Sequence, residues 1–211
     1  SLVGSEMCIR DRIMYRVIGL DVIVSTGIQD VLFVFALVGM VMGSISAIRQ
    51  TDIRRMIAFS SVAQIGYVFM GIGLGTDEGM MAATFHIFSH AVCKSMLFLA
   101  AGGLADASNN SKKFRDLRGA GFRSPIAGVA FTIGALSMVG FPFLGGFASK
   151  LNFALAAMDV GGARTMLVLI TLAISTWLNT LYFLRTVITL YRKPVPGAVY
   201  SVARGQRGFC F

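Results

Sequence analysis

The sequence predicts an all-α integral membrane protein with about five transmembrane helices, the fourth of them broken in mid-span. Of its 211 residues, 55% are hydrophobic and only 14% are charged, and its mean hydropathy of +0.74 is far above that of a water-soluble domain. Several apolar stretches reach the roughly 20 residues that cross a hydrocarbon core. The net charge of +9 lies in short loops between these stretches, which favours membrane topology over nucleic-acid binding.

The two ends of the chain are set apart from the membrane domain, which we place at residues 31–193. Residues 1–12, SLVGSEMCIRDR, show no hydrophobic period and resemble a translated sequencing adapter or a cloning scar. Residues 13–30 are assigned as a linker of undetermined status. Residues 194–211 contain proline and glycine and are either a solvent-exposed tail or a misread continuation. No function is assigned to either end.

The first expected helix covers residues 31–48 and contains no charge. Its Gly39 and Gly43 form a G-x-x-x-G pair, a pattern that permits close packing between membrane helices. A tight polar break, RQTDIRR, follows it. The sequence therefore predicts that this helix can pack closely against a neighbouring helix.

The second and third expected helices cover residues 52–74 and 79–104. Thr51 or Asp52 is suited to cap the second helix, because a short polar side chain accepts hydrogen bonds from the free amides of a helix start. The acidic turn GTDE separates the two helices. The third helix is apolar along most of its length but carries titratable side chains in its middle.

The fourth and fifth expected helices cover residues 125–157 and 165–191, after a basic loop at residues 106–123. The fourth is interrupted by small residues and a proline, namely Gly140, Pro142, Gly145 and Gly146. Such clusters mark an unwound segment, which a membrane protein tolerates only where protein or water satisfies the freed backbone groups. We therefore expect this helix to be broken in mid-span.

Five spans place alternate loops on alternate sides of the membrane, and the charges divide accordingly. One side receives the loop 106–123 and the cations Arg49, Arg54, Arg55, Arg192 and Lys193. The other receives Asp77, Glu78, Asp159 and Arg164. Lysine and arginine are enriched in loops on the cytoplasmic side. The first side is therefore predicted to face the cytoplasm or matrix.

Three titratable residues form a stripe along the third helix. His86, His90 and Lys94 recur every four residues, so they lie on one side of the helix, about 12 Å from first to last. A lysine at mid-span costs roughly 2.5 to 3.5 kcal/mol on insertion scales, and such residues usually face a bundle interior or a water cavity. No carboxylate lies between Glu78 and Asp106, so we expect the charge of Lys94 to be balanced by another helix or by water, or to be removed by loss of its proton. The stripe is suited to passing protons.

Two other interpretations of the histidines remain open. His86 and His90 can be packing histidines that are hydrogen-bonded within the core. They also form an H-x-x-x-H pair that can bind a metal, but such a site usually needs a third ligand, and no glutamate accompanies them. The three cysteines add neither a disulfide framework nor a metal-like spacing; they are Cys8, Cys93 and Cys210.

A further lysine, Lys150, directly follows the break in the fourth helix, in the segment GFPFLGGFASK. Broken membrane helices often lie at ion pathways, so Lys150 is the second candidate site. The alternative is a lysine that snorkels to the interface, which its mid-span position disfavours. Arg185 lies near the end of the fifth helix, where snorkelling is the better interpretation.

Three segments in this order resemble one family: QTDIRRMIAFSSVAQIGY, HIFSHAVCKSMLFLAAGGL and GFPFLGGFASK. They are similar to the antiporter-like membrane subunits of respiratory NADH:quinone oxidoreductase (complex I) and of Mrp-type cation/proton antiporters. Family members contain two inverted five-helix repeats, so the resemblance implies that this chain corresponds to the second repeat alone. It also implies a location in a bacterial or archaeal cell membrane.

The resemblance also implies roles for particular residues. His86, His90 and Lys94 match the proton-relay helix of the family, and Lys150 matches the lysine of its second broken helix. Arg54 occupies a position where the family usually has lysine, and because arginine stays protonated, we treat it as auxiliary. The implied partners are other membrane subunits, with protons and Na⁺ or K⁺ as transported ions.

The sequence contains no recognisable site for NADH, flavin, iron–sulfur clusters or quinone, so no cofactor is expected and any oxidoreductase activity belongs to the assembled complex. The working hypothesis is proton translocation, or cation/proton antiport, in which the third-helix stripe relays protons laterally toward Lys150. One rival is a structural membrane scaffold without conduction of its own. The other is a metal-dependent membrane enzyme that uses His86 and His90.

Overall fold

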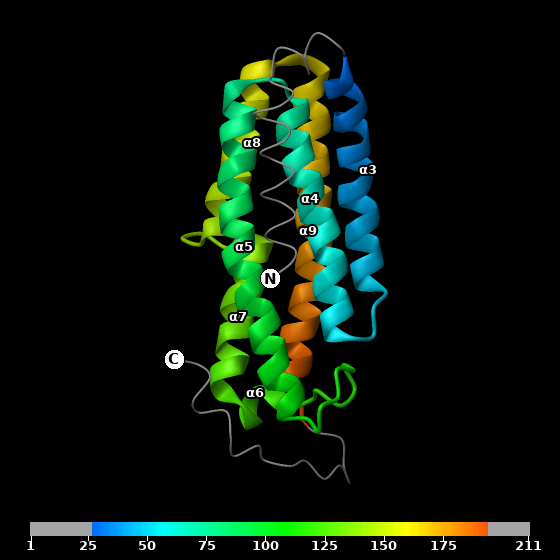
Figure 1. Cartoon of the computed structure of the whole chain (residues 1–211), viewed down its shortest axis with the longest axis vertical. Coiled ribbons are helices and arrows are strands. Elements are labelled where there is room, and N and C mark those ends of the chain that lie inside the picture. Colours follow the sequence, from blue (N-terminus) through cyan, green and yellow to red (C-terminus); the bar gives the residue numbers. More distant parts are fainter. Residues whose placement is uncertain (1–26, 194–211) are drawn as a thin grey trace.

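The computed structural model describes residues 27–193, and all regular structure in this range is helical (Figure 1). The helices are α3 (Ile28–Ile48), α4 (Ile53–Gly73), α5 (Asp77–Asp106), α6 (Ala120–Arg123), α7 (Pro125–Val139), α8 (Gly145–Val160) and α9 (Gly162–Leu190). Four of them, α3, α4, α5 and α9, are long and apolar enough to cross a membrane. The all-α membrane fold is therefore confirmed. The predictions for residues 1–12, most of 13–30 and 194–211 lie outside the described residues.

The helices begin and end within a few residues of the predicted positions, and the differences have local causes. Asp52 is the N-cap of α4, and its carboxylate accepts from the amides of Arg54 and Arg55. Helix α5 begins at Asp77, two residues earlier than predicted, because Thr76 caps it and accepts from the Gly79 amide at 3.1 Å. The acidic turn is thus the first turn of α5, where carboxylates favour the positive end of the helix dipole.

The tight pairing of α3 with α4 depends on one glycine of the predicted pair. A Cβ atom added to Gly43 would lie 2.7 Å from the Ala63 backbone nitrogen, so the two helices approach closely there. A Cβ atom on Gly39 would meet nothing within 4 Å. The prediction is therefore right for Gly43 and wrong for Gly39. On the facing helix, Gly66 makes the second close approach, beside Met40.

The predicted break divides the fourth span into α7 and α8. Helix α7 ends at Gly140, which has a φ of 96°, and Phe143 within the break has a φ of 71°. Phenylalanine rarely adopts this left-handed conformation. Helix α8 starts beside α7, since a Cβ atom on Gly146 would overlap the Ser137 carbonyl oxygen. The break is thus held by close backbone contact between its two halves.

The basic loops gather at one end of the bundle. The α3–α4 turn, α6 and the end of α9 lie at the lower end of the view in Figure 1. Arg123 secures the loop before α6 by donating to the carbonyls of Ala107 and Arg118, each at 3.0 Å. The same loop meets the start of α4, where the Ile53 amide donates to the Lys112 carbonyl at 3.0 Å. The basic loops, which are spread along the sequence, therefore lie together at one end of the folded bundle.

Candidate functional site

The titratable stripe of α5 faces the interior of the bundle. His86, His90 and Lys94 are only 5%, 2% and 5% exposed. The opposite side of α5 carries exposed apolar side chains such as Phe88. The two histidine rings stack with their centroids 5.9 Å apart. The four-residue spacing thus places all three groups on the buried side, as predicted.

Lys94 is held by α4. Its ammonium group donates to the Ile57 carbonyl at 2.6 Å and to the Ser60 hydroxyl. Ser60 in turn donates to the Ile57 carbonyl at 2.9 Å. The buried cation is therefore balanced by oxygen atoms of a neighbouring helix, one of the options expected from the sequence, and no described carboxylate pairs with it.

His86 joins the stripe to the broken span. Its Nδ1 atom and the Ser149 hydroxyl share a hydrogen bond of 2.6 Å, and Ser149 directly precedes Lys150 on α8. The charge of Lys150 acts on His86 electrostatically. Two aromatic rings enclose the imidazole, Tyr67 at 5.3 Å and Phe153 at 5.5 Å between centroids. The two sites predicted from separate motifs thus meet at His86.

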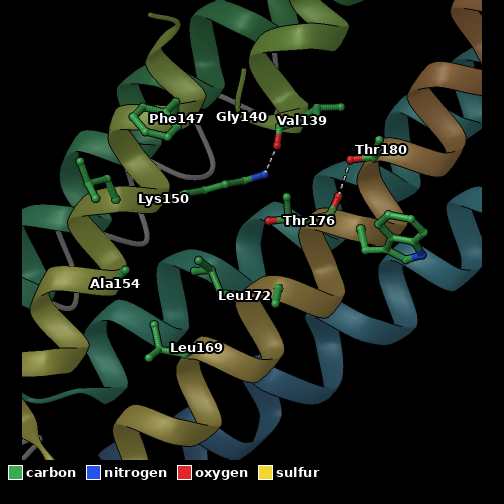
Figure 2. Close-up of a pocket in the computed structure, with 12 residues that line it drawn as sticks. Val139, Gly140, Phe147, Lys150, Ala154, Leu169, Leu172, Thr176 and Thr180 are labelled. Carbon is green, nitrogen blue, oxygen red and sulfur yellow. Dashed lines mark hydrogen bonds between the residues drawn. The ribbon is translucent and has the colours of Figure 1, made fainter. Parts of the chain in front are cut away.

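Lys150 extends from α8 across the break (Figure 2). Its ammonium group donates to the Val139 carbonyl at 2.6 Å and lies 3.3 Å from that of Met138. These are carbonyls of the last turn of α7, where the helix dipole is negative and favours a cation. Lys150 is only 8% exposed, so its side chain lies inside the bundle and does not extend to the surface as a snorkelling lysine would.

An open pocket of about 450 Å³ borders Lys150. Figure 2 shows it between the broken span and α9. Its walls are mainly apolar and include Phe147, Leu169, Leu172 and Trp177. Lys150 is the one titratable side chain among the lining residues.

Several buried nitrogen atoms of the site have no hydrogen-bond partner among the described residues. Both ring nitrogens of His90 are in this position, as are His86 Nε2 and Gln64 Nε2. Buried polar groups normally have a partner, and where the protein supplies none the partner is an ordered water. The interior around the α5 stripe is therefore suited to hold water between its titratable groups.

Two arginines considered from the sequence lie away from this site. Arg54 is half-buried in the first turn of α4, with its guanidinium directed toward Gly102 of α5. Arg185 is exposed and reaches the Ile48 carbonyl at 3.5 Å, at the end of α3. Among the described residues, neither arginine side chain forms a hydrogen bond with His86, His90, Lys94 or Lys150.

The site contains two features that the sequence prediction missed. Ser149 was not considered, because its contact with His86 links helices 63 residues apart in the chain. The buried face of α9 was also not considered, although it carries a run of polar side chains, Thr171, Ser175, Asn179, Tyr182 and Thr186. Their spacing of mostly four residues was a usable signal, because it places them on one face of a helix.

The described part of the chain contains no set of ligands that would support a metal site at His86 and His90. No group of three or more His, Cys, Asp or Glu side chains lies close enough there to hold an ion. Cys93, next to Lys94, is buried and lies 3.1 Å from the Ser137 hydroxyl. Its neighbours are thus those of a packing residue.

Comparison with known proteins assigns the family. Residues 12–176 match the model of the transmembrane family named NADH:quinone oxidoreductase/Mrp antiporter. The chain belongs to this family. The match includes the α5 stripe and Lys150, so the resemblance of the three motifs is confirmed.

Curated relatives of this chain include subunits of NADH-quinone oxidoreductase. NADH-quinone oxidoreductase subunit N of Desulforudis audaxviator is 38% identical over 189 residues, which are 89% of this chain and 37% of the relative. Subunit L of Buchnera aphidicola is 30% identical over 82% of this chain and 28% of its own length. The chain thus spans about a third of these curated relatives.

Solved structures show the same helical arrangement. A chain of the Mrp complex from a Dietzia species aligns with a TM-score of 0.72 at 28% identity, over 82% of this chain and 32% of that one. A chain of the membrane-bound sulfane sulfur reductase, an archaeal respiratory membrane complex, aligns at 0.70 with 30% identity, over 82% and 36% respectively. Together with the apolar helices, these relatives show that the chain is an integral membrane protein of the cell membrane.

Proposed function

We propose that this chain is a proton-conducting membrane domain of a subunit in an NADH:quinone oxidoreductase or Mrp-type antiporter complex. In it, His86, His90 and Lys94 of α5 relay protons laterally toward Lys150 of α8. The observation that carries the proposal is the 2.6 Å hydrogen bond between His86 and Ser149, because it brings the α5 stripe to the residue next to Lys150. We place the conducting domain at residues 31–193.

Each group in the proposed relay can take up and release one proton. The neutral amine of Lys94 takes up a proton, the resulting ammonium is held by Ile57 and Ser60, and it passes a proton to His90 through internal water. An imidazole accepts a proton on one ring nitrogen and releases another from the opposite nitrogen, so His90 and His86 return to neutrality after each transfer. Lys150 accepts the proton at the end of α7, where the carbonyls of Val139 and Met138 favour the charged form.

The names of the relatives support a proposal about the partners of this chain. Their names place them in multisubunit complexes, so we propose that other membrane subunits of a respiratory or antiporter complex surround this chain. In an Mrp-type complex the transported ions would be protons and Na⁺ or K⁺. In a respiratory complex the redox centres would lie in other subunits, and this chain would supply the membrane path.

The direct test replaces Lys94 with methionine, which is similar in length but cannot carry a proton. Inside-out vesicles from cells that express the full chain from its own gene are assayed for proton uptake, and the chain is quantified in the same membranes. Lys94→Met should abolish uptake at unchanged abundance. The matched control is Lys112→Met, in the exposed basic loop, which should transport normally. Normal uptake by the Lys94→Met vesicles would end the relay assignment.

The scaffold alternative has its own supporting observation. The hydrogen bonds of Lys94 to Ile57 and Ser60 tie α5 to α4, which is what a structural lysine does. If this is its whole role, Lys94→Met and Lys150→Met lower the abundance of the chain, and uptake falls only in proportion. The ratio of uptake to abundance therefore separates the two functions.

A further inference from the structure

A line of polar side chains runs along α9, outside the α5 stripe and without a role in the proposed relay. Its members Thr171, Ser175, Asn179, Tyr182 and Thr186 are each at most 9% exposed. The line extends over 16 residues of α9, which is about 22 Å from first to last at 1.5 Å per residue. Polar side chains inside a membrane bundle either tie helices together by hydrogen bonds or line a path for ions. The line is therefore a candidate for a role in ion movement.

This line meets the α5 stripe at Ser60. The Ser60 hydroxyl accepts from Lys94 and also interacts with the side chain of Tyr182. The Tyr182 hydroxyl donates to Asn179 Oδ1 at 2.7 Å. On the far side, the Ser44 hydroxyl of α3 lies 3.4 Å from the same Asn179 oxygen. Polar groups from four helices thus lie in sequence from Lys94 to α3.

Asn179 is the member that most clearly requires an additional partner. It is 0% exposed, and its Nδ2 atom has no hydrogen bond among the described residues. Leaving a buried amide nitrogen without a partner is unfavourable, so an internal water is expected to accept from this nitrogen. The hydroxyls of Ser44 and Tyr182 contact the oxygen atom of the same amide group, so such a water would be their neighbour.

We propose that Ser60, Tyr182 and Asn179 form a second proton path, which connects Lys94 across α4 to the α3–α9 interface at Ser44. This inference rests on the proposed function of Lys94. A proton on the water at Asn179 moves to the Tyr182 oxygen as the Tyr182 hydroxyl proton moves to the Ser60 oxygen. The Ser60 hydroxyl, turned away from the Ile57 carbonyl, then gives its proton to the neutral amine of Lys94, so the path feeds the α5 relay. One proton enters and one leaves, and both hydroxyls are restored. Asn179 acts as a positioning residue, because its amide holds the Tyr182 hydroxyl and the water.

The test removes a single hydroxyl from the path. Tyr182→Phe keeps the ring, which packs on Phe183 at 4.7 Å, and proton uptake is measured in H₂O and in D₂O in the same vesicles. Uptake should fall on the order of a hundredfold, the smaller end of what a positioned proton-transfer group contributes. The ratio of the rates in H₂O and D₂O should rise, because proton transfer becomes limiting. Tyr191→Phe is the matched control, as Tyr191 lies at the end of α9 against Phe122, and it should change neither value.

Three outcomes are decisive. Unchanged uptake in Tyr182→Phe, with Lys94→Met inactive, overturns the second path and leaves the α5 relay intact. Reduced uptake with an unchanged isotope ratio assigns Tyr182 a packing role and also overturns it. If Tyr182→Phe does not accumulate, Ser44→Ala removes one oxygen at the far end, and the same two measurements decide. Normal uptake by Lys94→Met would instead reject the proposed function itself.

Discussion

At the scale of single residues, the buried cations of this chain are held by oxygen atoms of neighbouring helices. Lys94 contacts a carbonyl and a hydroxyl of α4, and Lys150 contacts two carbonyls at the end of α7. Carbonyls and hydroxyls stabilise an ammonium group without the full negative charge that would fix it permanently. A lysine in such a setting can lose its proton more readily than one paired with a carboxylate.

The contact between His86 and Ser149 gives a prediction for one hydroxyl. Ser149→Ala removes a 2.6 Å hydrogen bond, and a neutral hydrogen bond contributes about 1 kcal/mol, or about fivefold. We expect proton uptake per chain to fall by about this factor, because His86 is no longer oriented toward α8. Ser95→Ala, on the exposed side of α5, is the control. Equal uptake in both variants would show that Ser149 does not orient the relay.

The sequence was sufficient to predict which titratable residues form the site, but not which residues they contact. His86, His90 and Lys94 could be placed on one face because helical periodicity is local. The bond from His86 to Ser149 could not, since it depends on how α5 and α8 pack. The polar face of α9 was only partly predictable. The four-residue spacing of Ser175 and Asn179 is visible in the sequence, but serine, threonine and asparagine are also common where helices simply pack together.

At the scale of elements, glycines decide how closely the helices pack. The break between α7 and α8 was predictable because proline and clustered glycines in one short segment weaken a membrane helix and favour local unwinding. The α3–α4 contact was predictable only in part. The pattern G-x-x-x-G marks a face that permits approach, but it does not say which glycine touches the neighbour. Gly43 does, and Gly39 does not.

Helix α3 allows a paired test of this difference. Gly43→Ala places a methyl group 2.7 Å from the Ala63 nitrogen, which forces α3 and α4 apart, and overpacking of this kind typically costs about 1 to 3 kcal/mol. The melting temperature of the purified chain in detergent should therefore fall. Gly39→Ala meets no atom within 4 Å and should leave the melting temperature unchanged or slightly raised, because alanine is the better helix former. A larger loss from Gly39→Ala would contradict the observed packing.

The break gives a second test at this scale. Gly146→Ala would overlap the Ser137 carbonyl, so α8 must shift relative to α7. Lys150 would then lose its contact with Val139. We expect Gly146→Ala to reduce the abundance of the chain in membranes, and the surviving protein to transport protons more slowly. Quantified immunoblots and proton uptake on the same vesicles measure both effects, and full abundance with full uptake would show that the close approach is dispensable.

At the scale of the whole molecule, charge separates the two ends of the bundle. The basic loops lie together at one end (Figure 1), and Asp77, Glu78 and the ion pair between Asp30 and Arg164 lie at the other. The positive-inside tendency predicts that the basic end faces the cytoplasm. A variant without native cysteines and with Lys112→Cys should react with an impermeant thiol reagent only in inside-out vesicles. Glu78→Cys should react only in intact cells or right-side-out vesicles, and the reverse pattern would invert the proposed topology.

The α5 stripe is proposed to carry protons and not merely to hold the helices of the bundle together. His90 tests this proposal most directly, because neither ring nitrogen makes a hydrogen bond with a described residue. A leucine at this buried position therefore removes no hydrogen bond to the described residues. Proton uptake per assembled chain should be lost in His90→Leu vesicles while the abundance of the chain stays at the wild-type level. Uptake at the wild-type rate would mean that protons do not pass through His90, and the relay would be refuted.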